Sequence, residues 1–76
     1  MSANANQRAR VLDYMGTRGG ITQIEALKEI GVMRLASRIS ELKKRGWHIG
    51  WEWQKGRNRY GEKYQVKRYY LEDSDG

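Results

Sequence analysis

The spacing of apolar residues changes at Gly46, and no other feature of this sequence limits its possible folds as much. Before Gly46 the apolar side chains recur every three or four residues, as on one face of an α-helix. After it they alternate with polar side chains, as on a β-strand. Since the chain has only 76 residues, both kinds of element must share one small core. The sequence therefore predicts a single α+β domain.

Two helices are predicted in the first part of the chain. The first spans residues 6–18, and glycines punctuate its end. The second starts near Gln23, because Thr22 and Glu25 have the spacing of a capping box, in which each side chain bonds the backbone amide of the other residue. Gly31 ends this helix after two turns.

A third helix is predicted over residues 34–45, and Gly46 ends it. Only three residues, Gly31 among them, separate it from the second helix, and the third helix carries the positive charge of the pair. Two helices joined in this way form a helix-turn-helix arrangement. The apolar stripes are Ile24, Leu27 and Ile30 in the second helix and Leu35, Ile39 and Leu42 in the third.

The alternating region predicts a β-hairpin. Residues 47–54 form its first strand, residues 55–61 its turn and residues 62–71 its second strand. Aromatic residues occupy both faces of the second strand, so the face that packs inward stays open at this point.

The apolar residues of the first strand divide into two groups. Trp47 and Ile49 are expected to pack against the helices, because a domain of this size needs large side chains to fill its interior. Trp51 and Trp53 lie further along the hairpin, where they fit either the core or a contact surface. His48 lies on the polar face and is expected to be exposed.

With a one-residue strand at Ile21, these elements follow the order of a winged helix. Two stretches, ITQIEALKEIGVMRLASRISELKKRGW and KGRNRYGEKYQVKRYYL, resemble the small helix-turn-helix proteins of bacteriophage and prophage genomes. The resemblance covers residues 7–71 and implies a winged-helix fold, DNA binding by the third helix and a basic hairpin, or wing. Tryptophan at positions 51 and 53 departs from that pattern and leaves a partner-binding role open. We place the domain at residues 6–71 and expect residues 1–5 and 72–76 to be disordered tails.

The net charge of +6 is concentrated in one part of the chain. Residues 34–71 hold eleven basic and three acidic side chains, whereas residues 1–33 hold four and three. A segment this basic is typical of proteins that bind polyanions.

Candidate contact residues follow from helix and hairpin geometry. Early positions of a recognition helix reach base edges, and arginine suits guanine, so Arg34, Ser37 and Arg38 are the predicted base contacts. Backbone or minor-groove contacts are expected from the end of the third helix and from a glycine-flexible hairpin tip. These residues are Lys43, Lys44, Arg45, Lys55, Arg57, Asn58 and Arg59.

No residue pattern supports catalysis. The sequence has no Ser, His and Asp constellation, no phosphate-binding glycine loop, no cysteine and a single histidine, so we expect neither an enzyme nor a metal or other cofactor. No apolar run is long enough to span a bilayer, and the first 20 residues do not resemble a signal peptide. We therefore expect a protein of the bacterial cytoplasm with no membrane partner.

The sequence is best interpreted as a double-stranded DNA-binding protein of phage or prophage type that regulates transcription or recombination. One recognition helix covers only a few base pairs, so a homodimer or tandem sites would be needed for strong specificity. Two alternatives stay open. One is a binder of RNA or single strands that uses the aromatic hairpin. The other is a protein-interaction module, such as a phage inhibitor of a host nucleic-acid machine.

Overall fold

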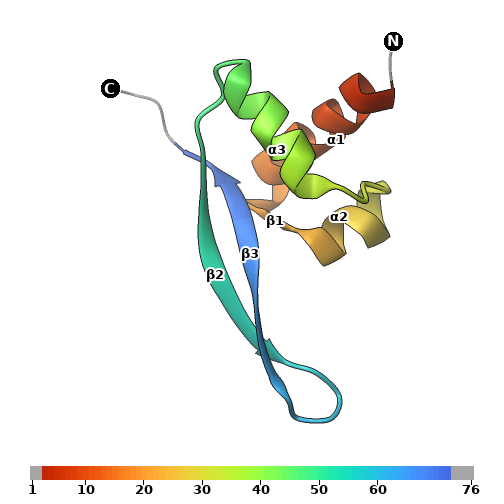
Figure 1. Cartoon of the computed structure of the whole chain (residues 1–76), viewed down its shortest axis with the longest axis vertical. Helices are drawn as coiled ribbons and strands as arrows, with labels where there is room; N and C mark the ends of the chain where they lie inside the picture. Colours follow the sequence, from red (N-terminus) through yellow and green to blue (C-terminus); the bar gives the residue numbers. More distant parts are fainter. Residues whose placement is uncertain (1–2, 73–76) are drawn as a thin grey trace.

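The structure is a computed structural model, and it describes residues 3–72. Its elements are α1 (Ala3–Arg18), β1 (Ile21–Thr22), α2 (Gln23–Ile30), α3 (Leu35–Lys44), β2 (Ile49–Arg57) and β3 (Lys63–Leu71). The strands form one antiparallel sheet in the order β1-β3-β2. The helices gather at one end of the hairpin of β2 and β3, and the other end projects away from them (Figure 1). The predicted α+β winged-helix architecture is confirmed.

The core lies where the three helices meet the base of the hairpin. Ile39 and Leu42 of α3 are buried as predicted, and Ile49 at the start of β2 closes the core from the sheet side. Most of the hairpin beyond this base is exposed. The largest fully buried side chains are Met15, Ile21, Leu35, Leu42, Val11 and Val32.

The predicted capping box starts α2. The backbone N–H of Glu25 donates to Thr22 Oγ1 at 3.3 Å, and the N–H of Thr22 donates to Glu25 Oε1 at 2.9 Å. Gly31 then ends the helix with a φ of 70°, a left-handed conformation that glycine adopts without a steric penalty. Only part of the predicted apolar stripe joins the core. Ile30 packs against it, but the helix packs inward mainly through Ala26 and leaves Ile24 and Leu27 about half exposed.

Gln23 connects the two helices of the helix-turn-helix unit. Its side-chain amide donates to the carbonyl of Val32 at 2.9 Å, and its Oε1 accepts from the backbone N–H of Leu35, also at 2.9 Å. Because Arg34, the N-cap of α3, makes no side-chain capping bond, Gln23 satisfies a free amide at the start of α3 from outside the helix. The angle between α2 and α3 is thus fixed by hydrogen bonds as well as by packing.

The ends of several elements differ from the sequence-based expectation. α1 begins at Ala3, so residues 3–5, which were expected to be a tail, are helical. The backbone N–H of Glu72 donates to the carbonyl of His48 at 2.9 Å, so this residue too is held against the fold. The rest of the two expected tails, residues 1–2 and 73–76, lies outside the described residues.

The first strand of the hairpin lies further along the chain than predicted, and the first tryptophan does not pack inward. β2 continues to Arg57, so Lys55 and Arg57 lie in a strand rather than in the turn. Trp47 is 46% exposed, because it precedes β2 and belongs to the connection after α3, where its N–H donates to the carbonyl of Leu42 at 3.1 Å. The expectation that Trp47 fills the core is wrong, whereas Ile49 is buried as expected and His48 is exposed.

The register of the hairpin settles which residues of β3 face inward. Ile49 pairs with Leu71, and Trp51 pairs with Tyr69, so Leu71 and Tyr69 share the face of Ile49 and pack against the core. Tyr70 lies on the opposite face.

Candidate nucleic-acid interface

The side of α3 that faces solvent is formed by small and basic side chains. Ala36, Ser40, Lys43 and Lys44 are exposed and Ser37 is partly exposed, whereas Leu35, Ile39 and Leu42 turn toward the core. We call these five outward residues the outer face of α3. Small side chains in its first turns let the helix backbone come close to a partner surface. The sequence-based prediction did not include Ala36 or Ser40, although a helical wheel places Ser40 on the side away from the apolar stripe and Ala36 at its flank.

The two predicted arginines of α3 have different environments. Arg34 is exposed at the N-cap position, beside Met33. Together with Asn4, Gln7 and Arg38, these two residues line a small hollow between the starts of α1 and α3. Arg34 is therefore free to contact a partner at the N-terminal end of the helix.

Arg38 is only 9% exposed and connects α1 to α3. Its guanidinium donates to Asn4 Oδ1, to Gln7 Oε1 at 3.3 Å and to Glu41 Oε2 at 3.0 Å. Arg38 is buried because it lies between Leu35 and Leu42 on the helix and faces the start of α1. The prediction that Arg38 contacts bases does not fit this burial, since both terminal nitrogens of its guanidinium donate to side chains of the fold.

Glu41 is the acidic residue of α3, and two arginines engage it. Arg8 of α1 donates to Glu41 Oε1 at 2.8 Å, while Arg38 binds the other carboxylate oxygen. The hydrogen bond from Arg8, aided by the charges of Arg38, Arg8 and Arg45, lowers the pKa of Glu41 against the opposing effect of burial. Because Arg8 and Arg38 balance the negative charge of Glu41, this carboxylate does not offset the positive charge at the C-terminal end of α3.

The remaining cations of α3 gather at its C-terminal end. Lys43, Lys44 and the C-cap residue Arg45 are all exposed. Their position complements the negative end of the helix dipole and places three charges at the C-terminal end of the outer face.

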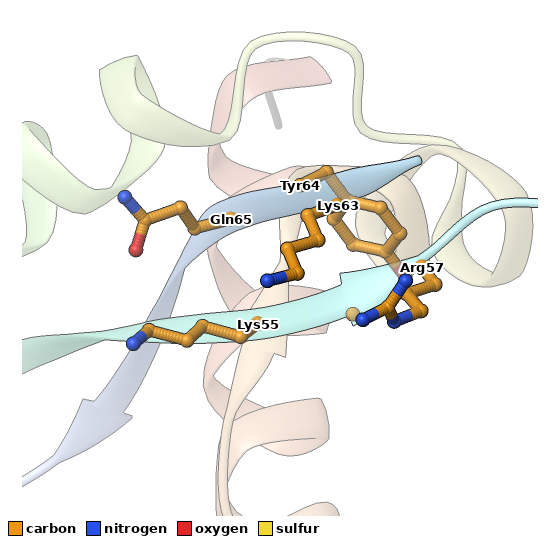
Figure 2. Close-up of a pocket in the computed structure, with 6 residues that line it drawn as sticks. Lys55, Arg57, Lys63, Tyr64 and Gln65 are labelled. Atoms are coloured by element: carbon orange, nitrogen blue, oxygen red, sulfur yellow. The ribbon is translucent and has the colours of Figure 1, made fainter. Parts of the chain in front are cut away.

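A second basic surface lies on the hairpin. β2 and β3 present Trp51, Trp53, Lys55 and Arg57 and their cross-strand partners Tyr69, Lys67, Gln65 and Lys63 on the side of Ile49, which we call the inner face. Lys55, Arg57 and Lys63 gather around a shallow depression at its far end, which Gly56, Tyr64 and Gln65 also line (Figure 2). The inner face carries four cations and, within the strands, no acidic side chain.

The turn of the hairpin is held by its own side chains. Asn58 Oδ1 accepts from the backbone N–H groups of Tyr60 and Glu62, and the Asn58 amide donates to Glu62 Oε1 at 2.8 Å. Arg57 donates to the carbonyl of Gly61 at 3.0 Å. Asn58, predicted to contact a backbone or groove, is thus a turn residue with both ends of its amide engaged. Arg59 is exposed at the tip.

The family model of the winged helix-turn-helix domain matches residues 6–74. The protein belongs to this family. Neither the curated proteins nor the solved structures contain a match to the chain. Winged helix-turn-helix domains are DNA-binding modules that typically have no enzyme activity.

In this winged helix-turn-helix protein, α3 is the second helix of the helix-turn-helix unit, and the hairpin is the wing. Of the predicted contact residues, the structure leaves Arg34, Ser37, Lys43, Lys44, Arg45, Lys55, Arg57 and Arg59 with exposed or partly exposed side chains. Across residues 3–72, no group of three or more His, Cys, Asp or Glu residues could hold a metal ion. In the same part of the chain, no helix is both long and apolar enough to cross a membrane.

Proposed function

We propose that this protein binds double-stranded DNA with the outer face of α3 in the major groove and the hairpin along the backbone or in the minor groove. The observation that carries the proposal is the arrangement of α3, with small side chains on the outward side and cations at both ends. Arg34 stands at the start of the helix, and Lys43, Lys44 and Arg45 stand at its end.

This arrangement suits a groove for steric reasons. The major groove of B-DNA is about 12 Å wide and admits one α-helix. Ala36, Ser37 and Ser40 extend only a short way from the helix, so the backbone of α3 can lie deep between the phosphates. Ser37 and Ser40 can donate to or accept from base edges, and Arg34 can donate two hydrogen bonds to a guanine.

The charge distribution supports the same ligand. Exposed cations occur on α3 and on the inner face of the hairpin, while Glu41 is neutralised by Arg8 and Arg38. The core holds the two basic surfaces together, so that they can contact the two phosphate backbones of a duplex. The hairpin cations are expected to contact phosphates or a minor groove and to position α3 without reading bases.

We place the protein among the phage or prophage regulators of transcription or recombination, acting in the bacterial cytoplasm. The resemblance of the helix-turn-helix and wing sequences to such proteins supports this assignment. A homodimer or two adjacent sites would extend the few base pairs that one α3 can read.

Titration of labelled duplex DNA at several salt concentrations tests the proposal. If about five phosphates are contacted, the plot of log affinity against log salt should have a slope of roughly −4 to −5. Lys44→Gln should reduce this slope by about one, whereas Lys28→Gln, which removes an exposed charge from α2, should leave it unchanged. Absence of duplex binding at low salt would refute the proposal.

A pull-down from bacterial lysate, with and without nuclease, tests the protein-interaction alternative. If duplex DNA is the ligand, associated proteins should be lost after nuclease treatment. A partner that stays bound after nuclease treatment, combined with no affinity for duplex, would favour the inhibitor role instead.

A further inference from the structure

Trp51 and Trp53 form an open aromatic corner on the inner face of the hairpin. Their ring centroids are 5.2 Å apart, and the ring planes meet at 84°. The two side chains are 42% and 52% exposed. They follow Ile49 on the same face of β2, but they lie beyond the point where the helices cover that face. Packing in the core therefore does not explain why tryptophan occupies these two positions.

Two contacts favour one arrangement of the corner before any ligand arrives. Lys67, the cross-strand partner of Trp53, places its Nζ 4.5 Å from the centroid of the Trp51 ring. This cation–π contact and the edge-to-face contact between the rings restrict both indoles. A ligand that stacks here thus orders few additional side chains, which reduces the entropic cost of binding.

The charges around the corner select the class of ligand. Lys67 lies beside it, and Lys55, Arg57 and Lys63 continue along the inner face toward the tip, with no acidic side chain on this face within the strands. An apolar side chain of a protein partner would pack on the indoles but would leave these cations without an anionic partner. Nucleic acid offers both a ring that stacks on an indole and phosphates for the cations.

Within nucleic acid, the corner selects unpaired nucleotides. In a duplex each base is covered by its neighbours on both sides, so only its edges reach the grooves. An unpaired base exposes its flat face, which stacks on tryptophan with a gain of about 1–3 kcal/mol per base. The cations alone would suffice for a duplex backbone, whereas two exposed indoles serve a ligand that has a free aromatic face.

We propose that Trp51 and Trp53 form a subsite for unpaired nucleobases, so that the protein recognises duplex DNA that adjoins a single-stranded segment. The inference rests on the proposed function, in which α3 holds the duplex. It adds a substrate class, a junction between paired and unpaired DNA. Trp53, the more exposed ring, is the stacking surface, and Lys67 is a positioning residue that holds Trp51.

The test compares three ligands: a blunt duplex, the same duplex with a short oligothymidylate tail, and the tail alone. The protein should bind the tailed duplex about fivefold or more tightly than the blunt duplex. Trp53→Ala should abolish this gain and leave the affinity for the blunt duplex unchanged. Trp47→Ala is the matched control, because Trp47 is similarly exposed but lies outside the inner face, and it should keep the gain.

Fluorescence provides a second readout that does not depend on affinity. In a Trp47→Phe background, tryptophan emission comes only from the corner, and the tailed duplex should quench it more strongly than the blunt duplex. Thermal unfolding should show that each variant is folded, which is expected because these side chains are exposed.

The outcomes separate the inference from the proposed function. Equal affinities for tailed and blunt duplexes overturn the inference while duplex binding stands. A gain that survives Trp53→Ala together with Trp51→Ala also overturns it. Tail binding without duplex binding refutes the proposed function but keeps the subsite. Sedimentation without DNA tests whether a second copy of the protein binds at the corner. Self-association that requires Trp53, together with equal binding of tailed and blunt duplexes, would assign the corner to that second copy and overturn the inference.

Discussion

Arg34 and Arg38 stand one helical turn apart, yet α3 presents only Arg34 to solvent. Arg38 turns toward α1, where Asn4 and Gln7 accept its hydrogen bonds, and Glu41 of α3 accepts another. The same residue type therefore serves two purposes within one turn. The charge of Arg34 is available to a ligand. Arg38 instead packs between α1 and α3, where its side chain takes the place of an apolar contact.

Substitutions of these two arginines should separate binding from stability. Arg34→Ala should weaken binding of a preferred duplex by about 1–3 kcal/mol with unchanged thermal unfolding, because an exposed side chain is removed. Arg38→Met should instead lower the free energy of unfolding by about 1–3 kcal/mol, because the acceptors in α1 lose their donor. Paired duplex titrations and chemical denaturation measure both effects. If Arg38→Met impaired binding at full stability, Arg38 would have to reach the ligand.

Tyr14 should make stability depend on pH in the alkaline range. Its hydroxyl donates to Glu29, and this hydrogen bond, together with burial and the charges of Glu25 and Glu29, raises its pKa from 10.0 to about 12. The folded state thus keeps a proton that the unfolded chain loses above pH 10. The contribution of Tyr14 is complete below pH 10 and is lost as pH rises toward 12.

Denaturation of the protein and of Tyr14→Phe between pH 8 and pH 12 measures this contribution. The stability of Tyr14→Phe should fall less steeply above pH 10, since the substituted ring has no proton to lose. Identical slopes in the two proteins would show that the hydrogen bond to Glu29 does not persist in solution.

At the scale of elements, the hairpin depends on glycines paired with tyrosines. Gly50 lies opposite Tyr70, and Gly56 lies opposite Tyr64. A Cβ atom at Gly50 would come within 2.9 Å of the Tyr70 ring, and one at Gly56 would also meet the ring of its partner. The tyrosine rings therefore cover the bare backbone of β2, which compensates for the low strand propensity of glycine.

Gly50→Ala should lower the free energy of unfolding by about 1 kcal/mol or more, because the Tyr70 ring must move. Gly16→Ala is the matched control. Apart from its chain neighbours and the backbone of α1 itself, no atom lies within 4 Å of its Cβ position, so the same added methyl group should stabilise the protein by about 0.5–1 kcal/mol. Chemical denaturation of both variants tests the pair. Unchanged stability in Gly50→Ala would mean that Tyr70 is not packed on β2.

At the scale of the whole molecule, two basic surfaces are joined by a small core. The helices and the base of the sheet form the core, and the far part of the hairpin extends beyond them (Figure 1). Because that part adds few buried contacts, its sequence is free to serve binding. Its removal should therefore affect binding more than folding.

A shortened hairpin tests this division of roles. Replacement of residues 55–65 by Asn-Gly would join Gln54 to Val66, which already pair across the hairpin, through a favourable two-residue turn. The variant should stay folded and bind duplex, but its salt slope should be weaker by about two to four, since four cations are removed. Circular dichroism checks the fold, and salt titrations check the slope. An unchanged slope would show that the hairpin does not contact phosphates.

The sequence by itself determined the elements that depend on near neighbours. The capping box of Thr22 and Glu25 and the left-handed Gly31 set the limits of α2. The first acts over three residues, and the N–H of Gly31 bonds the carbonyl of Ala26 five residues back. Alternation identified β2 and β3, because side chains of a strand must point to opposite faces. The exposed position of Lys44 followed in the same way from the spacing of the apolar stripe, which a helical wheel places on the other side of the helix.

The tertiary structure decided the features that depend on distant residues. Arg38 is buried because Asn4 and Gln7, more than 30 residues away, provide its acceptors, and α1 starts early enough to carry them. Trp47 is exposed because β2 begins only at Ile49, whose pairing with Leu71 sets the register. The propensity for a helix or strand depends on a few neighbouring residues, so it can be read from the sequence. Burial depends on which surfaces meet when the chain folds, and a single sequence does not show those contacts.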